Sequence, residues 1–229
     1  MSPITPQHNA ASRPEPIDPL RLEERFAQRL DELRTLLAFS DPEAIARMSG
    51  AVYTPGDALL TPDDRLNLAL WSAPISITCS EWVAYPEAEN QPLSAFDQAL
   101  ILYYLTTADG TSLTGEWIAF SDLPDGRFYN QAFQGYTGKQ LARLFQDDRV
   151  AFEQAAQALG GIRQPLGDAS FAFQALPRVP LLAVYWQGDE DFPSTCQVLF
   201  DAAASHYLPT DAYAILGSTL TRRLIKARR

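Results

Sequence analysis

Three consecutive acids, Asp189, Glu190 and Asp191, interrupt two apolar runs in the stretch AVYWQGDEDFPSTCQVLFD. Carboxylates grouped in this way can bind a hard cation or exchange protons with a substrate. The spacing departs from the D-x-D-x-D-G pattern of a calcium loop, and Gly188 favours a chain reversal between two strands. We therefore expect the three acids to form the solvated turn of a β-hairpin that also edges a cleft.

A second group with possible chemistry is the Glu116–Trp117 pair in the stretch LTGEWIAFSDLPDGRFYNQAF. Burial beside an indole can raise the pKa of a carboxyl group, as happens in general acids. Successive side chains of a strand point to opposite faces, so one member of the pair should face the core and the other solvent or a cleft. An ordinary strand with a buried tryptophan is the alternative. The predicted ligand-binding residues, taken together, are Glu116, Trp117, Tyr185, Trp186, Asp189, Glu190 and Asp191.

Cysteine and histidine are scarce in this sequence. Cys79 and Cys196 are too few for a disulfide framework or for a four-thiolate metal site. His8 falls in the proline-rich N-terminal segment, which leaves His206 as the histidine expected in the fold. A Cys196–His206 couple is one hypothesis, and a buried thiol with a partly exposed imidazole is the alternative. The sequence specifies no metal ligand set, and any cofactor is unknown.

The overall charge argues against nucleic-acid binding. The net charge is -10 and the pI is about 4.6, whereas binding to phosphates requires a basic surface. Positive charge gathers at the C-terminal end, where it favourably opposes a helix dipole; docking of an acidic partner or RNA is the alternative. No apolar run approaches the roughly 20 residues of a membrane span, and the N-terminus lacks a signal-peptide core. We therefore expect a cytoplasmic protein with no membrane or nucleic-acid partner.

The elements that position these residues follow from hydrophobic periodicity and capping signals. Helices are predicted near residues 19–39, 40–50, 94–109, 137–148, 149–161 and 211–226. Strands are predicted near residues 65–71, 75–79, 81–85, 115–120, 169–176, 179–186 and 196–201. Because the strands do not alternate strictly with helices, the sequence predicts an α+β fold with a mixed or antiparallel sheet packed with several helices. Residues 1–18 are predicted to be a disordered tail and residues 19–229 a single domain.

Four segments in this order are similar to one family: DQALILYYLTTADG, GEWIAFSDLPDGRFYNQAF, LPRVPLLAVYWQGDEDFP and LFDAAASHYLPTDAYAILGSTL. They resemble the family known as domain of unknown function 3786, over residues 26–224. The resemblance implies membership but no activity. It also implies, for some relatives, a fused cysteine-rich segment that binds an iron–sulfur cluster. The two isolated cysteines cannot supply that segment, so the resemblance gives no support for redox or corrinoid chemistry here.

The functional expectation is an accessory domain that binds a small molecule or a protein partner through the seven residues named above. An enzyme that uses Glu116 or Asp189 for acid/base chemistry, with a divalent cation, is the alternative. A third hypothesis is a protein-interaction module that uses the first helix or the basic C-terminal end. All three depend on which of these residues the fold brings together.

Overall fold

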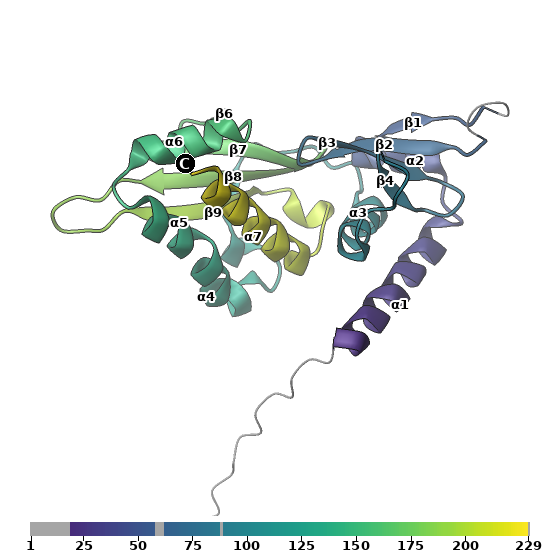
Figure 1. Cartoon of the computed structure of the whole chain (residues 1–229), viewed down its shortest axis with the longest axis horizontal. Coiled ribbons are helices and arrows are strands. Elements are labelled where there is room, and N and C mark those ends of the chain that lie inside the picture. The colour runs from purple at the N-terminus through teal and green to yellow at the C-terminus, as the bar shows by residue number, and fades with distance from the viewer. Residues whose placement is uncertain (1–18, 58–61, 88, 229) are drawn as a thin grey trace, which may run out of the picture.

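The described part of the chain, residues 19–57, 62–87 and 89–228 of the computed structural model, forms two antiparallel sheets and the helices around them (Figure 1). The predicted tail, residues 1–18, lies outside the described residues. The helices are α1 (Pro19–Leu37), α2 (Pro42–Ser49), α3 (Ala95–Thr107), η1 (Phe120–Asp122), α4 (Gly126–Tyr136), α5 (Gly138–Phe145), α6 (Arg149–Ala158), η2 (Ala204–His206) and α7 (Thr210–Ala227). The strands are β1 (Val52–Thr54), β2 (Arg65–Leu70), β3 (Ala73–Thr78), β4 (Ala84–Pro86), β5 (Trp117–Ala119), β6 (Ile162–Arg163), β7 (Ala169–Leu176), β8 (Val179–Trp186) and β9 (Thr195–Asp201).

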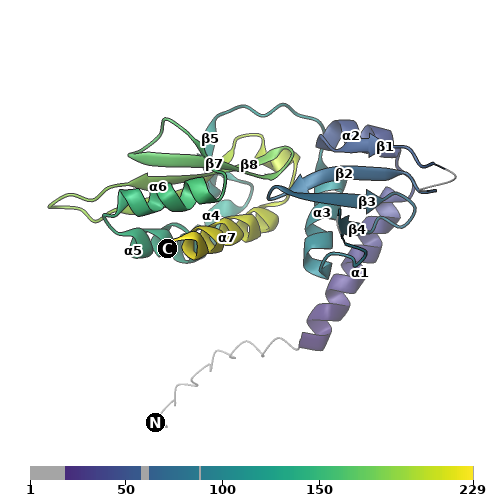
Figure 2. The same cartoon turned by 45° about the horizontal axis from the view of Figure 1, so that its top comes forward.

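The first sheet has the strand order β1-β2-β3-β4, and every neighbouring pair is antiparallel. Helices α1 and α3 pack against each other beside this sheet (Figure 2). Apolar residues at three- and four-residue steps (Leu22, Phe26, Leu30, Leu33 and Leu37) give α1 one apolar face, and this face is buried from Leu30 onward. Its earlier members, Leu22 and Phe26, lie outside the described side chains. Hydrophobic burial against α3 therefore holds the C-terminal half of α1 on the fold.

The second sheet has the strand order β5-β9-β8-β7-β6 and is also antiparallel throughout. Helices α4, α5, α6 and α7 cover one of its faces (Figures 1 and 2). Aromatic rings fill the space between: Phe200 of β9 lies 5.9 Å from Phe133 of α4 and 5.1 Å from Tyr213 of α7, measured between ring centres. Two antiparallel sheets with helices segregated around them confirm the predicted α+β class.

Helix α4 is a difference from the sequence prediction, which assigned no helix or strand between residues 120 and 137. Gly126 and Gly135 weaken the local helix signal of this segment, because glycine has a low helix propensity. Tertiary packing decides the outcome: Phe133 is fully buried and its ring stacks on Phe120 at 4.1 Å. Burial of that aromatic ring outweighs the low helix propensity of two glycines that lie at the first and the penultimate positions of the helix.

Hydrogen bonds join the first sheet and its helices to the second sheet. The main-chain amide of Trp71, at the tip of the β2–β3 hairpin, donates to the carbonyl of Ala175 in β7 over 2.9 Å. The hydroxyl of Tyr104 in α3 donates to the carbonyl of Ser49 and accepts from the amide of Arg178. One contiguous cluster of buried hydrophobic residues includes side chains from both sheets. Among the helices of the described ranges, none combines the length and the apolar composition that crossing a bilayer requires.

Candidate functional site

The three acids of the opening motif lie in the connection between β8 and β9, and the predicted hairpin is confirmed. Antiparallel pairing of the two strands extends to Trp186 and Thr195, immediately before and after the connection. The carboxylate of Asp189 accepts hydrogen bonds from the main-chain amides of Asp191 at 2.9 Å and Phe192 at 2.8 Å. Asp189 therefore has a structural role in the turn, because its carboxylate satisfies two amides that no strand partner reaches.

The Glu116–Trp117 pair lies at the opposite end of β9 from this turn. Trp117 pairs with Asp201, whereas Trp186 pairs with Thr195. Positions 195 and 201 are six residues apart, which is about 20 Å at about 3.4 Å per residue. The side chain of Glu116 is exposed, so Trp117 does not desolvate it. The fold thus keeps the two halves of the predicted ligand site at separate places.

Strand alternation further divides the predicted ligand-binding residues. Tyr185 faces the helices and is fully buried; its hydroxyl donates to the carbonyl of Gln146, and burial raises its pKa to about 12. Trp117 and Trp186 lie on the other face of the sheet, where they pack around Leu182, Val184 and Leu199. Tyr185 is therefore a core residue, while the two tryptophans shield an apolar sheet face that none of the described helices covers. A binding role for the exposed members stays a prediction.

The hypothetical Cys196–His206 couple is not formed. Cys196 lies in β9 next to its start and is buried, whereas His206 belongs to η2, beyond the end of the same strand. Burial raises the pKa of the Cys196 thiol to about 12 and that of Cys79 to about 11. Both thiols are therefore protonated at neutral pH, which is the opposite of what a cysteine nucleophile requires. The alternative prediction of a buried thiol and a partly exposed imidazole is confirmed.

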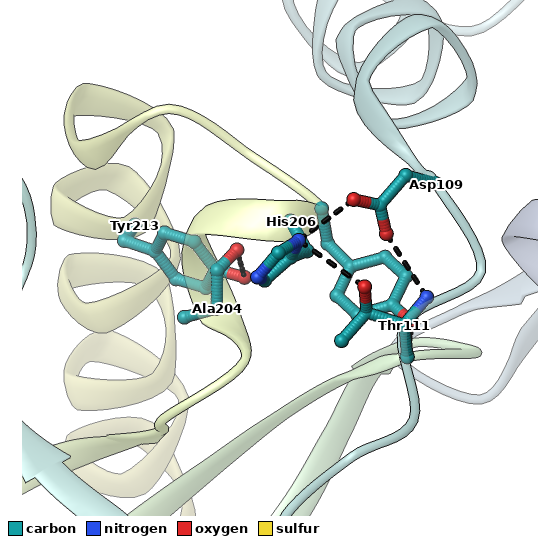
Figure 3. Close-up of polar contacts among 6 residues, drawn as sticks. Asp109, Thr111, Ala204, His206 and Tyr213 are labelled. Atoms are coloured by element: carbon teal, nitrogen blue, oxygen red, sulfur yellow. Dashed lines mark hydrogen bonds and ion pairs between the residues drawn. The ribbon is translucent and has the colours of Figure 1, made fainter.

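His206 instead contacts Asp109, a partner that sequence analysis did not anticipate (Figure 3). Asp109 Oδ2 lies 2.7 Å and Thr111 Oγ1 3.2 Å from Nδ1 of His206. The hydrogen bond with His206 is the largest cause that lowers the pKa of Asp109 to about 2. The Tyr213 hydroxyl, 2.8 Å from the Ala204 carbonyl, ties α7 to the η2 turn that carries the histidine (Figure 3). The sequence predicted only that a helix ends near Asp109. The contact of Asp109 with His206, 97 residues later in the sequence, depends on the tertiary fold.

A carboxylate bonded to Nδ1 is an arrangement that can orient an imidazole for proton transfer. However, the side chains of His206 and Asp109 are 45% and 51% exposed, so water screens the pair. Among the described residues, no group of three or more His, Cys, Asp or Glu side chains is placed to hold a metal ion.

Two surface pockets flank α7, which runs between α4 on one side and α3 with α1 on the other (Figure 1). A pocket of about 530 Å³ separates α1 and α3 from the start of α7. Its lining residues are Gln28, Arg29, Glu32, Phe96, Ala99, Leu100, Tyr103, Asp211, Ala212 and Ile215. Arg29 is fixed in its wall: Nε donates to the Tyr103 hydroxyl over 2.5 Å, and a terminal guanidinium nitrogen lies 2.6 Å from Glu32. These two bonds raise the pKa of Arg29.

On the other side of α7 lies a second pocket, of about 740 Å³, which we call the α4–α7 pocket. It is lined by Phe120, Leu123, Pro124, Asp125, Tyr129, Ala132, Tyr136, Ser205, Leu208, Pro209, Thr210, Asp211, Ala214 and Ile215. A third pocket, of about 510 Å³, adjoins the other two, and its lining residues are Phe96, Tyr136, Ala214, Ile215, Ser218 and Arg222.

The three pockets share residues and therefore adjoin one another. Ile215 lines all three, Phe96 links the first to the third, and Tyr136 links the third to the α4–α7 pocket. We call this continuous surface the α7 groove. Its floor consists of Asp211, Ala214, Ile215, Ser218 and Arg222, which recur at three- and four-residue steps on one face of α7. Sequence analysis predicted α7 and α3, but it gave no sign that these faces would meet.

The fold and this groove define an α+β protein with a helix-lined, largely apolar surface hollow. The chain belongs to the family described as Domain of unknown function (DUF3786), whose sequence model matches residues 41–223. The match includes both sheets and reaches into α7, while α1 precedes it. The family resemblance predicted from the four sequence segments is therefore confirmed. No curated protein and no solved structure matches the chain.

Proposed function

We propose that this protein is a binding domain for a small, largely apolar molecule, which it holds in the α7 groove. The continuity of the three pockets carries the proposal, because Ile215 contributes to all of them. Each pocket, at about 510 to 740 Å³, falls within the roughly 300–1,000 Å³ of small-molecule sites. Such sites combine apolar walls with a few polar groups, which Arg29 and Asp211 supply here.

Exposed aromatic surface in the groove supports the same proposal. Phe96 is 39% and Tyr129 65% exposed. Covering apolar surface stabilises a complex by about 25 cal/mol per Å², so a ligand that lies along the groove gains from both rings. The groove walls come from helices beside both sheets, and we therefore propose that residues 19–229 act as one domain. We also propose, as the sequence led us to expect, that the protein acts in the cytoplasm.

The test is the binding of N-phenyl-1-naphthylamine, a neutral dye whose fluorescence rises in apolar surroundings. We expect saturable binding to the wild-type protein. Ala214→Phe should weaken it at least about tenfold, because the added ring fills the groove floor at a partly exposed position. Ala158→Phe is the matched control, since Ala158 is an exposed helical alanine of α6 outside the groove lining. Equal binding to wild type and Ala214→Phe, or no saturable binding at all, would rule out the groove as a ligand site.

Acid/base catalysis, the alternative from sequence analysis, stays a prediction. The Asp109–His206 pair favours it more than Glu116 or Asp189 does, because its carboxylate lies 2.7 Å from an imidazole nitrogen. A catalytic role requires that His206→Gln abolish any turnover found for the protein while leaving dye binding in the α7 groove unchanged.

A further inference from the structure

The α4–α7 pocket differs in charge from the rest of the groove. Two carboxylates, Asp125 and Asp211, belong to its lining, and no lysine or arginine is among its lining residues. Arg222 lines the adjoining pocket, but it lies 11 positions after Asp211 on α7, which is about 16 Å at about 1.5 Å per residue. That separation exceeds the screening length of about 8 Å at physiological salt. The positive charge of Arg222 therefore contributes little at this end.

Helix dipoles reduce but do not cancel the negative charge. Asp125 immediately precedes the first residue of α4, and Asp211 is the second residue of α7. Each helix N-terminus contributes roughly half a positive charge, so two carboxylates and two N-termini leave roughly one net negative charge. The whole chain, with a net charge of -10, adds a long-range field of the same sign.

Besides its negative charge, the α4–α7 pocket has aromatic side chains in its wall. Tyr129 and Tyr136 are seven residues apart on α4 and lie on the same helix face, toward Ala214 and Ile215 of α7. The ring of Tyr136 is fixed edge-on against Phe133, with 5.7 Å between ring centres and an angle of 80° between the planes. The face of an aromatic ring attracts cations because its quadrupole places negative charge there.

From these observations we infer that the α4–α7 pocket selects the cationic end of its ligand, an ammonium group that carries apolar substituents. Methyl or alkyl substituents pack on the tyrosines and on Ile215, and the positive charge lies near Asp125 and Asp211. An anionic group would meet two carboxylates with no compensating base in the lining. The inference rests on the proposed function, since the remainder of the ligand occupies the rest of the α7 groove.

Choline and 3,3-dimethylbutan-1-ol test the charge preference directly, because a quaternary nitrogen in one replaces a quaternary carbon in the other. Dissociation constants come from chemical-shift titration of the labelled full-length protein and from displacement of N-phenyl-1-naphthylamine. We expect choline to bind at least about tenfold more tightly, which corresponds to about 1.4 kcal/mol. Shifts should be concentrated at residues of α4 and at the start of α7.

Variants at Tyr129 and at Asp211 separate the aromatic and the carboxylate contributions. Tyr129→Leu should abolish the preference for choline, whereas Tyr129→Phe should retain it, because phenylalanine keeps the ring face. Asp211→Asn should weaken choline about five- to tenfold and leave the alcohol unchanged. Asp148→Asn is the control: Asp148 caps α6 by accepting from the amide of Ala151, and it lies outside the groove lining.

The outcomes distinguish the inference from the proposed function. Equal affinity for choline and the alcohol, with the dye still bound, overturns the inference and leaves the groove a site for neutral apolar ligands. Preference for choline that persists unchanged in both Tyr129→Leu and Asp211→Asn also overturns it, because the cation would then bind elsewhere. Failure of the dye and of both small molecules to bind eliminates the proposed function and the inference together.

Discussion

Asp109 Oδ2 lies 2.7 Å from Nδ1 of His206, and this contact ties the segment after α3 to the η2 turn before α7. Thr111 binds the same carboxylate, because its main-chain amide donates to the other oxygen of Asp109 over 2.9 Å. The contact thus joins the segment between α3 and β5 to the segment between β9 and α7. Its strength depends on the negative charge of Asp109, which makes pH the natural variable with which to test it.

We expect the Asp109–His206 contact to be lost in acid. The pKa of Asp109 is lowered to about 2 in the folded protein, chiefly by the hydrogen bond with His206, against about 3.9 for an unfolded aspartate. The depressed pKa contributes stability above about pH 4 that disappears as the pH falls toward 2. The free energy of unfolding, measured with urea, should therefore fall more steeply in this range for wild type than for Asp109→Asn. Parallel curves for the two proteins would contradict this, and Glu190→Gln serves as an exposed-acid control.

The three acids of the β8–β9 turn should differ in their effects on stability. Asp189→Ala removes the acceptor of two main-chain amides and should cost about 1 kcal/mol. Glu190→Gln and Asp191→Asn should each change stability by less than about 0.5 kcal/mol, because both side chains are exposed. Chemical denaturation of the three variants decides the matter. Equal losses for all three would show that the carboxylate of Asp189 has no special place in the turn.

Asp201 should be the most sensitive carboxylate of the second sheet. It is 3% exposed and accepts from the amides of Thr114, Gly115 and Ala203 and from the Thr114 hydroxyl. Asp201→Ala should destabilise the protein by about 2–4 kcal/mol, since it removes a buried carboxylate and leaves four donors, including the buried Ala203 amide, without their acceptor. Hydrogen exchange of the Gly115 amide should accelerate beyond the change expected from global stability. Unchanged protection of that amide would contradict the role assigned to Asp201.

The hydroxyl of Tyr104 should contribute to the junction between the sheets. It lies between the Ser49 carbonyl and the Arg178 amide, and burial raises its pKa above the ordinary value of tyrosine. Tyr104→Phe keeps the ring but leaves both partners unsatisfied, so we expect a loss of about 1–3 kcal/mol in thermal or urea unfolding. Tyr129→Phe is the matched control, because Tyr129 is 65% exposed. A neutral Tyr104→Phe would mean that water replaces the hydroxyl.

Both cysteines should be unreactive in the native protein. Burial raises the pKa of Cys79 to about 11 and of Cys196 to about 12, so little thiolate is present at pH 8. Iodoacetamide should modify neither residue within the time that fully modifies both in urea. Mass spectrometry of the two peptides gives the extent at each site, and rapid native labelling of either cysteine would disprove its protection.

Local signals in the sequence predicted a helix or strand correctly where the intrinsic propensity of the segment and the burial of its apolar residues favour the same element. Ser94 caps α3 by accepting from the Asp97 amide, and Asp41 caps α2 by accepting from the Glu43 amide, close to the helix starts predicted near residues 94 and 40. Helix α4 was not predicted because its glycines weaken the local helix signal, while the burial of Phe133 that stabilises the helix depends on long-range packing.

The amino-acid sequence by itself determined the α+β class, the family and the β8–β9 hairpin, because caps, turn residues and hydrophobic periods act over a few neighbouring residues. Tertiary structure alone decided which distant groups meet. The strand order β5-β9-β8 separated Glu116 from the acidic turn by the length of β9, and the packing of α7 between α3 and α4 created a groove. Side chains far apart in sequence meet only when many weak contacts fix the positions of whole elements, and no local pattern records that geometry.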